Sequence, residues 1–339
     1  METSQLPERV NAISPKITHL IDLLGEVLLG NRELLENLVT GVLAGGHVLL
    51  EGMPGLGKTE LVKGLAHLCS IQFSRVQFTP DLLPSDITGS FILEQHESGH
   101  REFNFQEGPV FTNILLGDEI NRASPKTQSA LLEAMAERNV TVMGETRALP
   151  KPFFVIATQN PIEMEGTYPL PEAQVDRFLF KLHLGRPSEN VLKEIICNRP
   201  TGAPPTHEPC ITETELLEAI LLARDVFISE PVAAYISRLV EASHPDSALA
   251  PELVKKYVRH GGSPRAAIAL AGAARAQAVV LGRVQAGFDS ARQLYPAVMN
   301  HRIILDYAAR IDGVSVNDVM QAILTSVDEY SKALPDGVK

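Results

Sequence analysis

Gly52-Met53-Pro54-Gly55-Leu56-Gly57-Lys58-Thr59 is the stretch of this sequence that decides the fold, because it matches the pattern G-x-x-x-x-G-K-[ST]. The apolar run 47–51 before it predicts a buried strand, and residues 59–69 after it predict a helix. Strand, glycine-rich loop and helix form the first half of a βαβ unit. In this context the full pattern favours a phosphate-binding loop over a glycine turn that only caps a helix.

The residue types in this loop suit a nucleotide. Glycines let the backbone curl so that its N–H groups face phosphate oxygens, and the helix that follows adds its positive N-terminal end. Lys58 is expected to reach the β- and γ-phosphates, and Thr59 to offer a hydroxyl to Mg²⁺. We assign residues 52–59 and the adjacent Glu60 to nucleotide binding.

The elements around the loop predict an α/β fold with a parallel sheet flanked by helices. Short apolar runs predict further strands at 73–78, 113–116, 153–157 and 178–184. Helices are expected at 31–44 and 125–138, the second with Ser124 as N-cap. Because strands alternate with helices, the sheet should be parallel and covered on both faces. Two hairpins are expected as insertions, one formed by 90–95 and 101–106, the other around 143–146.

Polar residues that end two of these strands are candidates for chemistry. Asp118 and Glu119 follow an apolar strand, so Asp118 could hold Mg²⁺ through water and Glu119 could accept a proton from an attacking water. Asn160 ends another strand and could orient that water. Taken alone, these residues are also typical of solvated turns. Downstream of a phosphate-binding loop they favour hydrolysis over nucleotide storage.

Two arginines are further candidates. Arg177 lies just before an expected strand, and Arg265 opens an expected helix. A guanidinium recognises phosphate through bidentate geometry, although a lone arginine is more often a surface ion-pair partner.

The composition shifts at 198–211, where several prolines predict a linker. A capping box at 212–215 and helical periodicity follow, with clear helices at 264–282 and 316–334. We therefore expect an α/β nucleotide-binding core at 1–197, a linker at 198–211 and a small all-α lid at 212–339.

Composition excludes several classes of protein. With 339 residues, 45% hydrophobic and 21% charged, the chain is neither disordered, collagen-like nor a small disulfide scaffold. The net charge of −11 weighs against nucleic-acid binding, although a local basic channel stays possible. Three cysteines without a CxxC pair, no visible signal peptide and no long apolar segment predict a cytoplasmic protein without a membrane span. His96 and His100 are four apart, but no third metal ligand is evident.

Taken in order, the Walker A-like loop, the Walker B-like strand, Asn160, Arg177 and Arg265 resemble an AAA+ ATPase of the MoxR family over about residues 25–310. The family-typical runs are 45–59, 79–86, 118–125, 157–161 and 170–178. The resemblance implies that Asn160 is sensor 1, that Arg265 is sensor 2, and that Arg177 is an arginine finger acting on ATP held by a neighbouring subunit. It also implies that the hairpins are the helix-2 insert and the pre-sensor-1 hairpin.

The same resemblance implies cofactors and partners. ATP and Mg²⁺ are the expected cofactors, and a homo-oligomeric ring, usually a hexamer, is the expected assembly. A chaperone-like role on a client protein complex is expected, with a partner that carries a von Willebrand factor A domain. The alternatives are an AAA+ motor on nucleic acid, a chelatase-type ATPase subunit and an ATP-gated scaffold that does not hydrolyse. A DNA-binding test at varied salt would discriminate the first, and the set of Asp118, Glu119, Asn160 and Arg177 argues against the last.

Overall fold

The computed structural model describes residues 6–95, 101–160, 167–199 and 202–330. These divide into two compact units, one formed by 15–220 and the other by 1–14 with 221–339. No helix within the described ranges is long and apolar enough to cross a bilayer.

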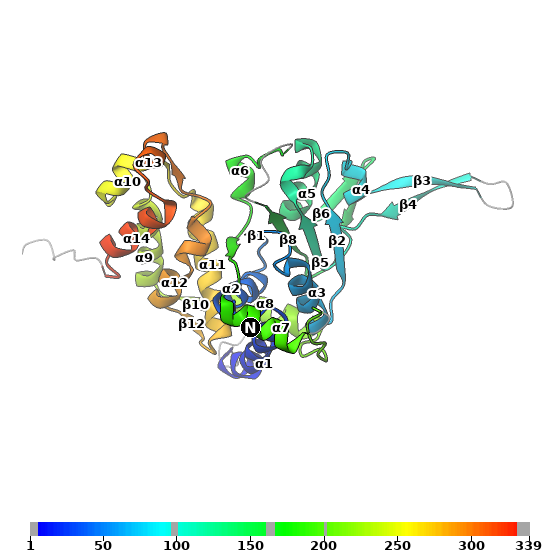
Figure 1. Ribbon diagram of the computed structural model, residues 1–339, viewed down its shortest axis with the longest axis horizontal. Helices are drawn as coiled ribbons and strands as arrows, with labels where there is room; N and C mark the ends of the chain where they lie inside the picture. The colour runs from blue at the N-terminus through cyan, green and yellow to red at the C-terminus, as the bar shows by residue number, and fades with distance from the viewer. Residues whose placement is uncertain (1–5, 96–100, 161–166, 200–201, 331–339) are drawn as a thin grey trace, which may run out of the picture. The chain divides into compact units, whose positions relative to one another are not determined.

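A five-stranded sheet forms the centre of the 15–220 unit, in the order β2-β5-β8-β1-β9. All neighbouring strands run parallel, so their carboxyl ends lie at one edge. The strands are β1 (Val48–Gly52), β2 (Phe73–Gln77), β5 (Ile114–Asp118), β8 (Phe154–Gln159) and β9 (Phe180–Leu184). Helices flank the sheet (Figure 1), which confirms the predicted fold class.

The helices of this unit include those expected at 31–44, 59–69 and 125–138, and several that the sequence analysis did not predict. They are α1 (Leu6–Val27, which begins in the other unit), α2 (Arg32–Leu43), α3 (Lys58–Leu68), α4 (Pro84–Thr88), α5 (Pro125–Glu137), α6 (Glu172–Val175), α7 (Glu189–Asn198) and α8 (Glu213–Asp225). The side chain of Ser124 accepts a bond from the Thr127 amide, which confirms the predicted N-cap of α5. Apolar residues of α5 such as Leu131 and Met135 pack with β5 and β8 residues such as Leu115 and Val155.

His47 joins three elements of this core. Its buried ring accepts a bond at Nδ1 from the Val155 amide over 2.9 Å and donates from Nε2 to the Met135 carbonyl over 3.0 Å. Burial lowers the pKa of His47 to about 4, with a smaller lowering from the charge of Arg138. The ring is therefore neutral in the folded protein at physiological pH.

This histidine predicts an acid-sensitive fold. Between about pH 6.5 and 4, His47 is protonated in the unfolded chain but stays neutral in the folded chain. The free energy of unfolding therefore falls as the pH drops through this window, by roughly 3 kcal/mol in total. Denaturant unfolding of the full chain at stepped pH values measures this slope. His47→Gln should flatten it, whereas the exposed-histidine variant His19→Gln should keep it. An unchanged slope in His47→Gln would assign the acid sensitivity to other groups.

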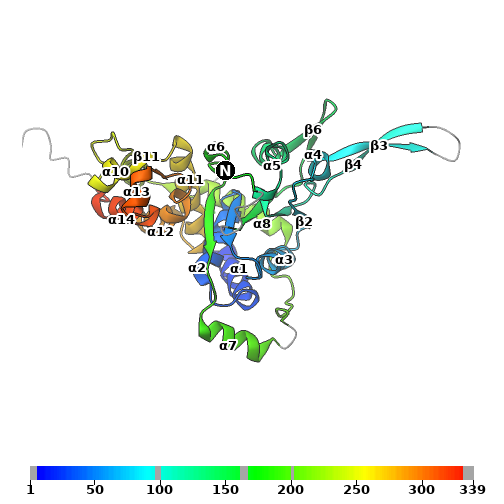
Figure 2. The same ribbon diagram turned by 45° about the horizontal axis from the view of Figure 1, so that its top comes forward.

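Both predicted hairpins are present. β3 (Gly89–Gln95) pairs antiparallel with β4 (Arg101–Glu107), and β6 (Asn139–Val142) pairs with β7 (Glu145–Ala148). The β3–β4 hairpin projects from the sheet (Figures 1 and 2). His96 and His100 lie outside the described residues. The guanidinium of Arg147 on β7 lies 4.3 Å from the ring centroid of Phe105 on β4, so the two hairpins are in contact.

The proline-rich segment expected as a linker is held against the 15–220 unit. The Cys210 and Ile211 amides donate to the Leu68 carbonyl over 2.9 and 3.1 Å. The predicted capping box forms, with the Glu215 amide bonded to Thr212 and the Glu215 carboxylate bonded to the Thr212 amide. Lys16 also bonds Glu215, which lowers the pKa of that carboxyl to about 2. Residues up to 220 belong to the same compact unit as the sheet.

The 221–339 part is mainly helical. Its helices are α9 (Glu230–Glu241), α10 (Glu252–Tyr257), α11 (Pro264–Val280), α12 (Phe288–Met299), α13 (Tyr307–Ile311) and α14 (Val316–Ser326). Two short strand pairs, which the all-α expectation did not include, join β10 (Phe227–Ile228) to β12 (Gln285–Ala286) and β11 (Val258–His260) to β13 (Ile304–Leu305). The helix expected at 316–334 ends at Ser326, where Val327 turns extended.

Candidate functional site

The glycine-rich loop connects the end of β1 to the start of α3. Gly55 and Gly57 have φ angles of +78° and +89°, a region that L side chains rarely adopt. An added Cβ at Gly55 would meet nothing within 4 Å, so this position requires glycine for its backbone conformation and not for lack of space. Pro54 and Gly55 are exposed, while Met53, Leu56 and Gly57 are half-buried.

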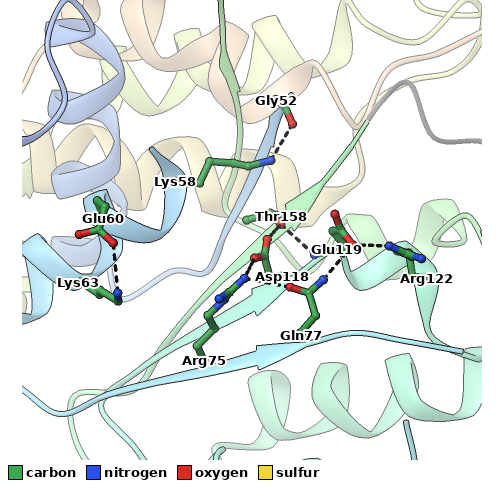
Figure 3. A network of polar contacts seen from close by, with 10 residues as sticks. All are labelled: Gly52, Lys58, Glu60, Lys63, Arg75, Gln77, Asp118, Glu119, Arg122 and Thr158. Carbon is green, nitrogen blue, oxygen red and sulfur yellow. Dashed lines mark hydrogen bonds and ion pairs between the residues drawn. The ribbon is translucent and has the colours of Figure 1, made fainter. Parts of the chain in front are cut away.

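Lys58 opens α3 and is buried. Its Nζ donates to the Gly52 carbonyl over 2.6 Å (Figure 3), which holds the ammonium across the loop. Burial lowers the pKa of Lys58, and the charges of Asp118 and Glu119 oppose this shift. The lysine and the two acids therefore share one electrostatic environment, as expected for a single site.

The next two residues of α3 differ in setting. Thr59 is half-buried beside Lys58. Glu60 is exposed, and its Oε1 lies 3.1 Å from Nζ of Lys63 on the same helix. That ion pair is a surface contact, so the assignment of Glu60 to nucleotide binding stays a prediction.

Asp118 ends β5 between two neighbouring strands. Its Oδ1 accepts a bond from the Thr158 hydroxyl of β8 over 2.6 Å, and its Oδ2 accepts one from Nη2 of Arg75 on β2, also over 2.6 Å (Figure 3). Only 13% of the Asp118 side chain is exposed. The carboxylate is thus fixed in position by both flanking strands.

Glu119 follows directly, with a φ of +59° in the left-handed region that non-glycine residues seldom adopt. Its amide donates to the Thr158 hydroxyl over 2.9 Å. Its Oε2 accepts from Nε2 of Gln77 over 2.9 Å and from Nη1 of Arg122 over 3.0 Å. The Thr158 hydroxyl therefore bonds both acidic residues, donating to Asp118 and accepting from Glu119.

The other predicted residues lie in different settings. Asn160 is buried just beyond β8, at the sheet edge where Asp118 also lies. Arg177 lies between α6 and β9, is exposed, and donates from Nη1 to the Leu132 carbonyl of α5 over 3.1 Å. Arg265 is exposed on α11 and belongs to the other unit. The loop, the two acids and Asn160 thus lie at the carboxyl ends of the strands in one unit. Arg177 belongs to the same unit, whereas Arg265 belongs to the other.

Sequence reasoning missed four polar residues that contact the acids: Arg75, Gln77, Arg122 and Thr158. A signal for two of them exists, since Arg75 and Gln77 alternate with the buried Val76 and so point to one face of β2. Which residues lie beside Arg75 and Gln77 depends on the strand order, which places β5 next to β2, and on the register, in which Gln77 pairs with Asp118. The sequence alone does not contain that pairing.

The residues present fit Mg²⁺ and a nucleotide. The loop offers glycines at positive φ before the N-terminus of α3 and a buried lysine, and Thr59 and Asp118 offer the hard oxygen ligands that Mg²⁺ prefers. Among the described residues no three His, Cys, Asp or Glu side chains gather into a metal-holding group. A metal here would accordingly take most of its ligands from phosphate and water, which is typical of Mg²⁺ at nucleotide sites.

Comparison with known proteins agrees with this geometry. Residues 47–180 match the ATPase family associated with various cellular activities (AAA), and residues 250–323 match the AAA lid domain. Chaperone MoxR1 of Mycobacterium tuberculosis is 44% identical over 301 residues, which are 89% of this chain and 79% of that protein. Protein MoxR of Methylorubrum extorquens is 30% identical over 90% of this chain and 92% of its own length.

The chain belongs to the MoxR family of AAA ATPases.

Other similarities of this MoxR-family chain cover nearly its whole length. The uncharacterized protein YeaC of Bacillus subtilis is 41% identical over 93% of this chain and 95% of its own. A crystal structure of a candidate ATPase from Cytophaga hutchinsonii superimposes with a TM-score of 0.86 at 40% identity, covering 95% of this chain and 97% of that one. The family resemblance and fold class predicted from the sequence are both confirmed.

Proposed function

We propose that this MoxR-family chain is a Mg²⁺-dependent ATP hydrolase. The observation that carries the proposal is that the loop with buried Lys58 and the two acids lie at the same carboxyl edge of the sheet, where the charges of Asp118 and Glu119 act on Lys58. A cation for phosphate, a carboxylate for the metal and a second carboxylate for a water proton are the parts that phosphoryl transfer to water needs.

Each residue then has a defined role. The loop amides of 52–59 and Lys58 bind and orient the phosphates, with Glu60 assigned to the same binding segment. Thr59 and Asp118 would hold Mg²⁺, which would neutralise charge on the phosphate oxygens. Glu119 takes the proton of the attacking water, and Asn160 orients that water.

The assembly proposal rests on the two arginines and on the relatives. An exposed Arg177 on a loop before β9 is available to a neighbouring subunit, so we assign it as the finger of a homo-oligomeric ring, with six subunits. Arg265 on the lid is assigned as sensor 2, the residue through which the lid responds to the bound nucleotide. Because one relative is named a chaperone, we infer a role in remodelling or maturing a client protein complex. A partner with a von Willebrand factor A domain and a location in the cytoplasm are further parts of the proposal.

Lys58→Ala tests nucleotide binding. A charge-assisted contact to phosphate is lost, so ATP affinity should fall by at least roughly 10-fold. Isothermal titration calorimetry with ATP and Mg²⁺ measures this. Lys63→Ala, an exposed lysine on the same helix, is the matched control and should bind like the wild type. Unchanged affinity in Lys58→Ala would refute the proposed site.

A further inference from the structure

Arg75 forms an ion pair with Asp118, the proposed metal ligand. Its Nη2 lies 2.6 Å from Oδ2 of Asp118 and 3.0 Å from Oε1 of Gln77, which steadies the guanidinium from the same strand (Figure 3). The Arg75 side chain is 44% exposed, whereas that of Asp118 is 13% exposed. The arginine is therefore the more exposed partner of this ion pair.

Both oxygens of Asp118 are engaged. Thr158 donates a neutral hydroxyl to Oδ1, and Arg75 brings a full positive charge to Oδ2. A divalent cation at Asp118 must share that carboxylate with a guanidinium already in contact with it. Like charges at such short range oppose each other, and this opposition persists at a partly buried carboxylate.

Resting on the proposed function, we propose that Arg75 is a positioning residue that weakens the Mg²⁺ affinity of Asp118. Asp118 would then hold Mg²⁺ well only together with a nucleotide whose phosphates supply additional negative charge. Arg75 thus acts on how strongly nucleotide binding depends on Mg²⁺, and not on the proton transfer assigned to Glu119.

The test measures metal dependence without turnover. Affinity of the full-length protein for a fluorescent ADP analogue is recorded against free Mg²⁺, which yields the Mg²⁺ concentration for half-maximal tightening. Removing one screened charge next to the ligand should lower that concentration about 3- to 10-fold in Arg75→Gln. Arg75→Met, equally uncharged, should give the same shift, and Arg75→Lys should stay close to the wild type because it keeps the charge.

Two controls separate this role from general effects. Arg283→Gln removes an exposed arginine that likewise pairs with one carboxylate, Asp289, at 2.6 Å. This variant should not change the Mg²⁺ concentration for half-maximal tightening, here called the half-point. In an Asp118→Asn background, Arg75→Gln should have no further effect on the half-point, since the arginine acts through that carboxylate.

The outcomes are distinct. A wild-type protein that binds no ADP analogue would overturn the proposed function itself. A wild type with normal Mg²⁺ dependence, together with an unchanged or raised half-point in both Arg75→Gln and Arg75→Met, would overturn the role of Arg75 alone. A full shift that persists in the Asp118→Asn background would assign the effect of Arg75 to another group.

Discussion

Arg177→Ala is expected to bind ATP like the wild type and yet hydrolyse it about 10³-fold or more slowly, the range measured for arginine fingers supplied in trans. The physical reason is that charge spreads over the transferred phosphoryl oxygens, where a guanidinium from the next subunit stabilises it. Steady-state phosphate release, measured at a protein concentration that supports assembly, gives the rate. Arg283→Ala, another exposed arginine, serves as the control and should retain activity.

The local alternative makes a different prediction. If the main role of Arg177 is its hydrogen bond to the Leu132 carbonyl, Arg177→Ala should be mildly less stable and should keep most of its specific activity. A near-wild-type rate in Arg177→Ala would therefore reject the finger.

Mixing variants tests the trans arrangement. Lys58→Ala and Arg177→Ala should each be inactive alone, but a Lys58→Ala subunit can lend its arginine to an intact loop next door. Hydrolysis should then recover in part when the two are titrated together and subunit exchange is verified. Absence of recovery in verified mixed assemblies would count against a finger that acts between subunits.

Glu119→Gln is expected to bind ATP but to hydrolyse it at least ~10²-fold more slowly, because glutamine keeps the shape of the side chain and cannot take a proton. Binding by calorimetry and turnover by phosphate release separate the two effects. Glutamine can still accept one of the bonds from Gln77 and Arg122, so the site should keep its structure. The same variant should trap an assembled, client-bound state for affinity capture.

A control and a contrary result complete this test. Glu252→Gln neutralises an exposed acid on α10 and should leave the rate unchanged. Wild-type turnover by Glu119→Gln would move the role of base to another residue.

The loop and the two acids could be predicted from the sequence because their signals are local. A glycine pattern between an apolar strand and a helix determines its own geometry, and an apolar run that ends in Asp118 and Glu119 places those acids at the edge of a parallel sheet. The capping box at 212–215 and the N-cap at Ser124 were predictable for the same reason.

Other features could not be predicted because they depend on distant pairing. Arg75 and Thr158 reach Asp118 only because β2 and β8 flank β5, an order that no local pattern specifies. The contact of 210–211 with Leu68 likewise joins distant segments, so a proline-rich composition suggested a free linker. Strand pairs of two or three residues, such as β10 with β12, are too short to show a period.

The contact between the two hairpins has an evolutionary consequence. The guanidinium of Arg147 lies against Phe105, which in turn stacks edge to face with Phe91 and Phe111. Loss of the β6–β7 insertion would expose aromatic surface on β3–β4. Loss of β3–β4 would leave the guanidinium of Arg147 without its aromatic contacts. We therefore expect homologues to gain, lose or lengthen the two insertions together.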